Sequence, residues 1–324
     1  MMNPIIQTIR AANRILVTTH TDPDGDAVGS LLAMGLALER LGKPVTWYNE
    51  SPIPAVYQFL PAVGRIERRL PPAGAYDTAV VLDCGDLSRT GAAWRVVSQV
   101  PALINIDHHV SNTGFGSHRL MDGQACATAE IVYRLIQALG VPLDKDMATC
   151  IYTGILTDTG SFRFSNTNAA AFAISREMME CGVDPYEVAQ HVFGSYSLGR
   201  IKLLNLALNS IEISRNGKLS LMTVTRGMLE ETRTQQEDVD GLINYARRIE
   251  DVRVAALIQE QGNGRTAADG RVHLHVSLRS DGSVDVAALA GTFGGGGHRT
   301  AAGFQIESNL AAIKAELLAW AERI

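Results

Sequence analysis

The sequence has few of the features that mark disulfide-bonded or membrane-bound proteins. Its four cysteines stand singly, without a C-x-x-C pair, so neither a zinc knuckle nor a redox dithiol is indicated. Residues 1–12 contain a lone Arg10 and no long apolar run, which predicts neither a signal peptide nor a membrane span. These absences favour reduced thiols and a cytoplasmic location.

Positive charge and aromatic side chains are also scarce. Acidic residues outnumber basic ones by 34 to 29, which gives a formal net charge of −5. The chain therefore has no overall positive field to hold long nucleic acid against salt. Aromatic residues make up 6% of the chain, too few to indicate a long base-stacking groove. Any contact with nucleic acid is expected to be local.

The composition that remains is that of a globular protein with two domains. The chain has 324 residues, 46% of them hydrophobic and 19% charged, which is enough apolar material for two buried cores. No internal repeat or low-complexity tract is evident. We expect one domain at residues 1–190, a helical connector at 191–210 and a smaller α/β domain at 211–324.

The first half of the chain predicts an α/β fold, a mostly parallel sheet flanked by helices. Three apolar runs, Arg14–His20, Thr78–Asp83 and Ala102–Asp107, are predicted strands, and each ends in residues that can bind a metal. Ligands of open parallel sheets bind at the carboxyl ends of the strands. These three strand ends are therefore expected to form one site.

Helices and then a second sheet are predicted in the rest of the chain. The stretch from Ala125 to Gly194 has mainly helical periodicity, with breaks near residues 140–142, 160 and 182–185. Asn216-Gly217 lies between two apolar runs and predicts a two-residue hairpin turn. Further strands are expected near Val252–Gln259, Val272–Leu278 and Phe304, followed by a helix from about Asn309.

An imidazole and three carboxylates follow the first strand, in His20-Thr21-Asp22-Pro23-Asp24-Gly25-Asp26. A helix is predicted over Ala27–Leu41, and its N-terminus needs one capping residue, a role that fits Asp26. Capping leaves the crowding of His20, Asp22 and Asp24 without a reason, because like charges repel unless a cation compensates them. A metal site is favoured, with a capped and solvated loop as the alternative.

The other strand ends and one helix add more potential ligands. Asp83 ends the second strand, and Asp107-His108-His109 end the third. A single aspartate at a strand end is more often a cap or a turn residue, so each is ambiguous alone. Asp158 lies in an apolar helix that ends at Gly160, where a charge is costly to bury unless it is paired or binds a metal.

Taken in order, these motifs resemble the four motifs of the DHH phosphoesterase superfamily. The match runs from His20-x-x-x-Asp24-x-Asp26 through Asp83 and Asp107-His108-His109 to Asp158. The resemblance implies two Mn²⁺ ions bridged by Asp83, the first also bound by His20 and Asp24. It gives the second ion Asp26, Asp83, His108 and Asp158. It also implies that His109 faces the substrate phosphate and assists the leaving group, while Asp107 orients a neighbouring histidine.

Oxygen and imidazole ligands without thiolate suit Mn²⁺, although Co²⁺, Mg²⁺, Fe²⁺ or Zn²⁺ could occupy the same set. Two ions roughly 3.5–4 Å apart can share a hydroxide and stabilise both the entering and the leaving oxygen of a phosphate ester. A metal-bound hydroxide is therefore the expected nucleophile. Cys84 is interpreted as a small core residue, because the ligand set is complete without it.

A glycine-rich segment near the C-terminus resembles the signature of the DHH-associated C-terminal domain. It reads Gly294-Gly295-Gly296-Gly297-His298, followed by Arg299-Thr300-Ala301-Ala302-Gly303. Glycines let backbone N–H groups approach a phosphate, and Arg279 would add a forked donor. A flexible turn is the alternative for the glycines, and a surface role is the alternative for Arg89. The candidate substrate-binding residues are Arg89, Arg279, Gly295, Gly296, Gly297 and His298.

Within this superfamily, the layout resembles small bifunctional enzymes that degrade short oligoribonucleotides to mononucleotides and convert 3′-phosphoadenosine 5′-phosphate to AMP. The alternatives are a phosphodiesterase of cyclic or linear dinucleotides (pApA, pGpG) and a catalytically silent nucleotide-binding protein. A RecJ-type exonuclease would need additional domains, and a family II pyrophosphatase would lack the glycine-rich segment. Short RNA or DNA oligonucleotides, dinucleotides and nucleoside bisphosphates are the expected partners, without a membrane or long nucleic acid. Cleavage polarity, base preference and assembly as a monomer or homodimer stay open.

Overall fold

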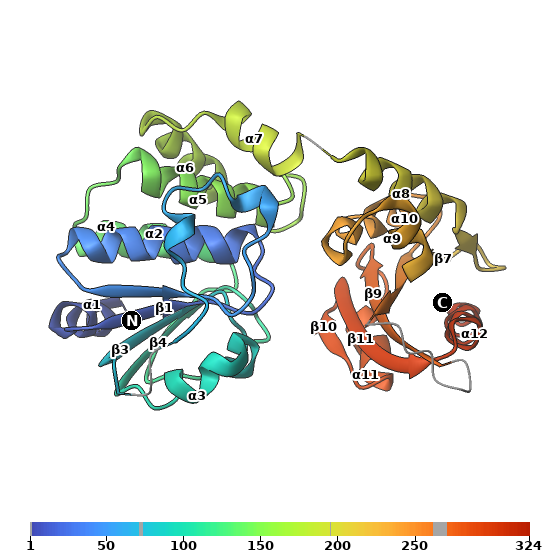
Figure 1. Cartoon of the computed structure of the whole chain (residues 1–324), viewed down its shortest axis with the longest axis horizontal. Helices are drawn as coiled ribbons and strands as arrows, with labels where there is room; N and C mark the ends of the chain where they lie inside the picture. Colours follow the sequence, from blue (N-terminus) through green and yellow to red (C-terminus); the bar gives the residue numbers. More distant parts are fainter. Residues whose placement is uncertain (1, 71–73, 195, 262–270) are drawn as a thin grey trace. The chain divides into compact units, whose positions relative to one another are not determined.

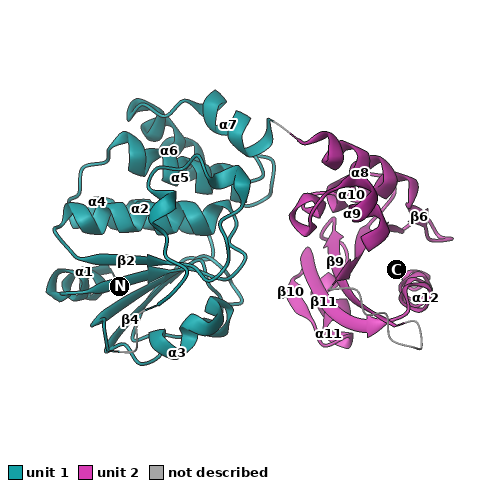
Figure 2. Ribbon diagram, in the orientation of Figure 1, with its two compact units in different colours: residues 1–195 teal, residues 196–324 magenta. Residues whose placement is uncertain are grey.

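A computed structural model of the chain describes residues 2–70, 74–194, 196–261 and 271–324 (Figure 1). The chain divides into two compact units, residues 1–195 and 196–324 (Figure 2). Each unit has its own sheet and its own buried apolar clusters.

In the first unit, five parallel strands form one sheet in the order β2-β1-β3-β4-β5. All four strand pairs are parallel, which confirms the predicted α/β fold class. The three strands predicted from the sequence correspond to β1, β3 and β4. The bounds are β1 Ile15–Thr18, β2 Val45–Tyr48, β3 Thr78–Leu82, β4 Ala102–Asp107 and β5 His118–Met121.

Helices cover both faces of this sheet. One face packs against α1, α2, α4 and α5 around a large apolar cluster, and the other packs against α3. The predicted helical stretch after residue 125 is confirmed, with its breaks. The bounds are α1 Met2–Ala11, α2 Gly25–Arg40, α3 Trp94–Val97, α4 Thr128–Leu139, α5 Lys145–Asp158, α6 Ala169–Glu180 and α7 Pro185–Phe193, with short 3-10 turns η1 Ala55–Tyr57, η2 Val63–Arg65 and η3 Leu87–Ala93.

Two glycines allow α2 and α5 to lie very close together. A Cβ atom on Gly29 would lie 2.4 Å from the Cys150 carbonyl oxygen. A Cβ on Gly154 would lie 2.7 Å from the Cβ of Ala129 and 2.9 Å from Asp26 Oδ1. Any larger residue would force the helices apart. The glycine contact therefore brings the N-terminal part of α2 against the C-terminal half of α5.

The second unit has a mixed sheet of six strands in the order β10-β11-β9-β8-β7-β6. Only the β7–β8 pair is parallel among the pairs that the structure describes. Apolar clusters lie on both faces, one with α11 and α12 and the other with α8, α9 and α10. The strands are β6 Glu212–Ile213, β7 Leu219–Val224, β8 Val254–Gln261, β9 Val272–Ser280, β10 Gly296–His298 and β11 Ala301–Ser308. The helices are α8 Leu198–Asn209, α9 Arg226–Thr232, α10 Ile243–Arg247, α11 Val286–Thr292 and α12 Leu310–Ala321, with the 3-10 turn η4 Gln236–Val239.

The hairpin at Asn216-Gly217 exists, but the predicted two-residue turn is wrong. The N–H of Ser214 donates to the carbonyl of Leu219, so four residues, 215–218, connect the strands. Asn216 accepts from the N–H of Lys218 and donates to the carbonyl of Ala321. This side chain thus ties the loop to the end of α12, a long-range contact that a local turn rule cannot include. None of the described helices is long and apolar enough to cross a membrane.

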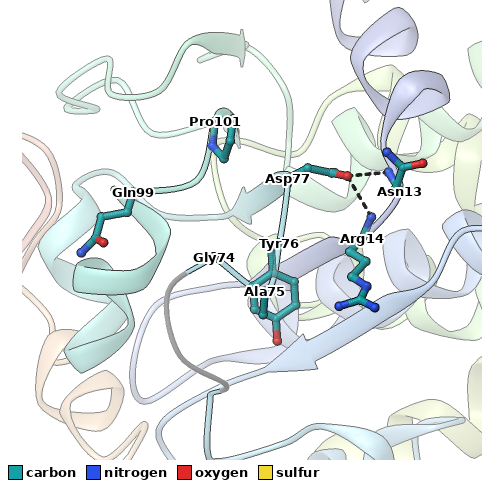
Figure 3. A pocket seen from close by; sticks show the side chains of 8 residues that line it. All are labelled: Asn13, Arg14, Gly74, Ala75, Tyr76, Asp77, Gln99 and Pro101. Carbon is teal, nitrogen blue, oxygen red and sulfur yellow. Dashed lines mark hydrogen bonds between the residues drawn. The ribbon is translucent and has the colours of Figure 1, made fainter.

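A hollow of about 440 Å³ lies at the amino ends of the strands of the first unit (Figure 3). It is lined by residues just before β1, β3 and β4, including Arg14, Asp77 and Pro101. Asp77 Oδ2 accepts from the backbone N–H groups of Asn13 and Arg14, at 2.8 and 3.3 Å. This carboxylate therefore holds two strand beginnings together. The residues predicted to bind metal lie at the opposite, carboxyl ends of the same strands.

Candidate metal centre

The carboxyl ends of β1, β3 and β4 bring His20, Asp83 and the Asp107-His108-His109 segment together, as the sequence predicts. Asp83 follows β3 with a left-handed backbone (φ 52°), a conformation that costs a residue other than glycine roughly 1–3 kcal/mol. Its N–H still donates to the Ile106 carbonyl at 3.0 Å. The strain therefore falls on the residue at the centre of the candidate site.

The capping residue of α2 is Asp24, so the assignment of that role to Asp26 is wrong. Asp24 Oδ1 accepts from the N–H groups of Asp26 and Ala27. Asp26 lies one residue into the helix, where its carboxylate accepts from the backbone of Thr128 and Ala129 at 2.6 and 2.9 Å. Both donors are at the N-terminus of α4, which favours negative charge.

Asp22, the third carboxylate of this loop, lies outside the cluster. It is exposed, and its Oδ1 accepts from the Ser51 hydroxyl at 3.0 Å. The same hydroxyl accepts from the Asp22 N–H. Asp22 thus shapes the loop and is not positioned as a ligand.

Three overlapping groups of side chains could each hold a metal ion, with ligand atoms within 4.8 Å of one another. They share Asp83 or His108. The groups are His20, Asp24 and Asp83; Asp26, His108 and Asp158; and Asp83, His108 and His109. All six residues assigned to the two ions by motif are therefore brought together.

The spacing inside these groups suits ligands of a common ion better than direct hydrogen bonds. His20 Nε2 lies 3.7 Å from Asp83 Oδ2, and His108 Nε2 lies 3.8 Å from Asp83 Oδ1 and 3.7 Å from Asp158 Oδ2. Hydrogen bonds are shorter than about 3.2 Å. Two ligands at about 2.1 Å from one ion are separated by roughly 3.0–3.5 Å. A small contraction would place these pairs around an ion.

Backbone carbonyls orient two of the histidines. His20 Nδ1 lies 2.7 Å from the Thr21 carbonyl oxygen, and His108 Nδ1 lies 3.4 Å from that of Ala125. A ring whose Nδ1–H donates to a carbonyl keeps a free lone pair on Nε2, the form that binds metals. In both rings the Nε2 atom faces the carboxylates.

His109 is held differently, by a buried carboxylate. Its Nδ1 lies 2.7 Å from Asp107 Oδ1, and Asp107 is fully buried. The other oxygen of Asp107 accepts from Asn112 Nδ2 at 2.6 Å. Burial lowers the pKa of His109, but the hydrogen bond to Asp107 and the charge of Asp83 raise it to about 9 overall. In the metal-free protein His109 therefore carries a proton at neutral pH.

The carboxylates show that the cluster holds more negative charge than its donors balance. Burial, together with the charges of Asp83 and Asp158, raises the pKa of Asp26 well above its ordinary value. Burial raises the pKa of Asp158 to about 7, with His108 opposing and Asp83 adding to the shift. Burial also acts on Asp83, but the neighbouring imidazole of His20 and the charge of His109 hold its pKa below the usual range. A bound cation would oppose the upward shifts of Asp26 and Asp158, because positive charge favours the ionised carboxylates.

Three neighbours that support the cluster were not identified from the sequence. Thr128 Oγ1 donates to Asp83 Oδ1 at 2.9 Å, and Asn112 holds Asp107. Asn166 Nδ2 donates to Asp158 Oδ2 at 3.0 Å and to the Cys126 carbonyl at 2.8 Å. They lie in a helix start and two loops, and no spacing rule connects them to the motifs.

Cys84 and Arg89 are not among the clustered ligands. Cys84 is buried, and its thiol donates to the Asp86 carbonyl. Burial raises the pKa of Cys84 to about 12, so it stays a thiol. The Arg89 side chain is exposed on η3, and its carbonyl accepts from the Thr21 N–H at 2.8 Å. Arg89 therefore braces the His20 loop through its backbone, and a substrate role for its side chain stays a prediction.

In the second unit, Arg279 lies on β9, between Ala255 of β8 and Ala301 of β11. Its Nη1 donates to the Leu278 carbonyl at 3.0 Å. Burial and the charge of Arg247 lower the pKa of Arg279, whereas Asp240 acts in the opposite direction. His275 lies four positions earlier on the same side of the strand. Basic groups therefore gather on this face of β9.

The glycine run forms β10 and the turn before it. A Cβ on Gly295 would lie 2.2 Å from the Gly303 carbonyl oxygen, and one on Gly297 would lie 2.6 Å from that of Ala301. These two glycines are required by the close approach of β11. Gly296 is exposed, and a Cβ there would meet nothing within 4 Å. The fold therefore gives no reason for a glycine at position 296.

Comparison with known proteins identifies two domains in the chain. Residues 14–155 match the DHH family, N-terminal domain, and residues 219–323 match the DHHA1 domain. The chain is 35% identical to the bifunctional oligoribonuclease and PAP phosphatase NrnA of Thermus thermophilus, over 89% of this chain and 83% of the relative. It is 25% identical to the Bacillus subtilis protein of the same name, over 95% and 94% of the two chains.

Solved structures agree with this relationship. An exopolyphosphatase-related protein from Bacteroides fragilis superposes with a TM-score of 0.88 and 25% identity, covering 98% of this chain and 95% of that chain. Thermus thermophilus RecJ in complex with Mn²⁺ shares the fold, with a TM-score of 0.58 at 16% identity. The match covers 54% of the RecJ chain. The chain belongs to the DHH family, and its second unit carries the DHHA1 domain.

Proposed function

We propose that this protein is a metal-dependent phosphoesterase that hydrolyses short oligoribonucleotides to mononucleotides and 3′-phosphoadenosine 5′-phosphate to AMP. One observation carries the proposal, the convergence of six carboxylate and imidazole ligands around Asp83. The relatives named as bifunctional oligoribonucleases and PAP phosphatases, which align over most of the chain, support the choice of substrates.

The residues present fit a pair of divalent ions, and we propose Mn²⁺. His20, Asp24 and Asp83 would hold one ion, and Asp26, Asp83, His108 and Asp158 would hold the other, with Asp83 shared. When bound, such ions neutralise the carboxylates, polarise the phosphate and make water a stronger nucleophile. The raised pKa values of Asp26 and Asp158 support this assignment, because burial and the neighbouring carboxylates both disfavour negative charge there, and a cation would stabilise it.

His109 and Asp107 would handle the leaving group. Asp107 holds the Nδ1 side of the His109 ring, and the Nε2 side would face the phosphate ester. The protonated ring can donate a hydrogen bond to a phosphate oxygen and a proton to the departing alkoxide. Asp107 would keep the ring oriented and stabilise its positive charge.

The second unit would bind a substrate phosphate other than the one being cut. Arg279 offers a planar, forked donor, and His298 and the backbone at Gly296 and Gly297 would add further donors. Gly295 would contribute through its lack of a side chain, because its N–H already donates to the Ala290 carbonyl at 2.9 Å. The open space beside Gly296 supports this role, because a glycine without a structural reason there leaves room for a ligand.

We also propose that residues 1–190 form the catalytic domain and residues 211–324 the substrate-binding domain, with 191–210 between them. All four cysteines are free, which fits a reducing compartment and a cytoplasmic location.

The test is a hydrolysis panel with Mn²⁺. It contains 3′-phosphoadenosine 5′-phosphate, RNAs from a dimer to a 25-mer, a cyclic dinucleotide and pyrophosphate. We expect phosphate release from the first substrate and efficient cleavage of the shortest RNAs, with kcat/KM falling as the RNA grows. Asp83→Asn is the inactive control, and a chelator should abolish turnover until Mn²⁺ is restored. Hydrolysis of pyrophosphate alone, or of a 25-mer as efficiently as a dimer, would contradict the proposal.

A further inference from the structure

The two proposed ion positions are held by different parts of the first unit. We call the position formed by His20, Asp24 and Asp83 the first ion position. His20 Nδ1 lies 2.7 Å from the carbonyl oxygen of Thr21, the next residue. Asp24 Oδ1 accepts from two N–H groups in the first turn of α2, which Asp24 itself caps. His20 and Asp24 are therefore fixed by backbone next to them in sequence.

The second ion position depends on a distant segment, the start of α4. This position is formed by Asp26, His108 and Asp158, with Asp83 shared. His108 Nδ1 lies 3.4 Å from the Ala125 carbonyl oxygen. The helix start at Ala127 has no capping side chain of its own. Instead, Asp26 caps α4 from another helix, accepting from two of its N–H groups at 2.6 and 2.9 Å.

One residue of this segment, Thr128, contacts two of the proposed ligands. Its N–H is the donor to Asp26 Oδ2 at 2.6 Å, and its Oγ1 donates to Asp83 Oδ1 at 2.9 Å. Thr128 is fully buried, and a buried acceptor that loses its donor is not readily compensated by water. The hydroxyl is therefore a fixed constraint on the shared carboxylate.

The two oxygens of Asp83 face different ion positions. Oδ2 lies 3.7 Å from His20 Nε2, on the side of the first position, whereas Oδ1 lies 3.8 Å from His108 Nε2, on the side of the second. The Thr128 hydroxyl contacts Oδ1. A carboxylate oxygen has two lone pairs, so Oδ1 can accept this hydrogen bond and still bind an ion. Both contacts of Thr128 thus fall on carboxylates of the second position.

We propose that Thr128 is a positioning residue for the second ion position, where its hydroxyl keeps Asp83 Oδ1 directed at the ion. Without the hydroxyl, the carboxylate could turn about its Cβ–Cγ bond, and the geometry of the second position would no longer be fixed. The first position has its own local contacts and should be affected little. This inference rests on the proposed metal-dependent function and goes beyond it, because it makes the two ions separable.

The experiment measures Mn²⁺ binding in the absence of substrate. Thr128→Val removes the hydroxyl and keeps the branched shape, whereas Thr128→Ser keeps the hydroxyl. Thr153→Val is the matched control, because Thr153 is equally buried and its hydroxyl donates to the Thr149 carbonyl at 2.8 Å instead of to a ligand. Each protein is freed of metal, separated from the chelator and titrated with Mn²⁺, and the free ion is measured by electron paramagnetic resonance.

The wild-type protein should bind two Mn²⁺ ions. In Thr128→Val, one of the two should bind on the order of 10- to 100-fold more weakly, the range for loss of a group that supports a metal ligand. The other should bind within about twofold of its wild-type affinity. Thr128→Ser and Thr153→Val should keep both affinities. Thermal melting of the metal-free variants checks that each is folded, and Thr128→Ala repeats the test should the valine prevent folding.

Three results would overturn the inference. They are wild-type binding of both ions by Thr128→Val, equal weakening of both ions, and a Thr128→Ser variant as weak as Thr128→Val. The last would mean that packing of the side chain matters and the hydroxyl does not. A wild-type protein that binds no Mn²⁺ would instead refute the metal-dependent function itself, and the inference with it.

Discussion

The candidate site of the first unit is centred on buried carboxylates, whereas that of the second unit includes exposed glycine backbone beside an arginine and a histidine. Asp26, Asp83 and Asp107 are at most 2% exposed, and each accepts hydrogen bonds from fixed donors. Gly296 is exposed, and a Cβ atom there would meet nothing within 4 Å. Chemistry needs charges held at fixed positions, while the capture of a phosphate needs accessible N–H groups. Substitutions in the first unit should therefore affect turnover, and those in the second should affect binding.

The largest effect is expected from Asp83→Asn. Asp83 belongs to two of the three ligand groups and accepts from Thr128, so its loss should weaken both metal sites. We expect kcat to fall on the order of 100-fold or more, as when a central electrostatic group is removed. Bound metal, measured by elemental analysis, should also fall. An active variant that retains two ions per chain would show that the two metal sites do not depend on Asp83.

Asp107→Asn should give the next largest effect. The amide can no longer balance a positive charge on His109, whose Nδ1 lies 2.7 Å away. Loss of such a supporting group typically costs about 10- to 100-fold. The decrease should appear in kcat, with KM and bound metal unchanged. A loss of metal together with activity would mean that Asp107 keeps the metal ligands in place and does not act by orienting His109 as the acid.

Arg279→Ala should lower kcat/KM for 5′-phosphorylated dinucleotides about 10- to 100-fold, the range for one hydrogen bond to a charged group. A small chromogenic phosphodiester, which has no second phosphate, should be cleaved as by the wild type. Both metal ions should stay bound. Equal losses on the two substrates would contradict the proposal that the first unit carries out hydrolysis and the second unit binds another phosphate of the substrate.

Gly296→Ala and Gly295→Ala form a matched pair with smaller effects. A methyl group fits at position 296, so the first variant should fold normally and raise KM several-fold, by about the factor of one neutral hydrogen bond. At position 295 the methyl would collide with the Gly303 carbonyl and Phe304, so thermal stability should fall. Thermal melting and KM measured together separate the two. An unchanged KM for Gly296→Ala would show that no ligand approaches there.

The smallest effect concerns the pH dependence of stabilisation by Mn²⁺. Because the pKa of Asp158 is raised from 3.8 to about 7, the folded metal-free protein binds more protons than the unfolded chain in that interval. Its stability therefore falls as pH rises from about 4 to about 7, and Asp26 acts in the same direction. Asp83 has a lowered pKa and contributes only below this interval. The raised pKa of His109 extends the fall above pH 6.5.

Metal ions replace these protons, so the increase in Tm on adding Mn²⁺ should grow from about pH 5.5 to about pH 7.5. Hydrogen exchange should show the added protection in α5 and the loop before α2, with no change in β9. A constant increase in Tm across this range, or protection of β9, would contradict a metal site confined to the first unit.

Strand ends were the most predictable part of the molecule. A buried apolar run that stops at a polar residue identifies both the strand and its end, so His20, Asp83 and Asp107 could be grouped from the sequence. The choice between Asp24 and Asp26 as the capping residue failed because the helix begins at Gly25, and glycine gives no helical signal. A rule based on local sequence cannot tell which of two aspartates so close to a helix start is the capping residue.

Supporting contacts could not be predicted, because tertiary packing creates them. Asn112 and Asn166 reach Asp107 and Asp158 from loops whose paths depend on the whole domain. Ser161 and Phe162, which follow α5, have left-handed backbones with φ of 61°. This conformation is contrary to the backbone preferences of both residues, so local sequence predicts against it. Such exceptions to local rules are expected near functional sites, where the surrounding structure enforces them.

The contact between α2 and α5 has a consequence for how this site can change. Asp24 and Asp26 begin one helix, Asp158 ends the other, and Gly29 and Gly154 set the distance between the two backbones. The dimensions of the ion-binding region are therefore encoded at two positions that have no functional group. A substitution as small as Gly29→Ala would increase the distance between α2 and α5 while leaving every ligand residue in the sequence. Selectivity for ions of different radius could then evolve, or be engineered, through helix spacing alone.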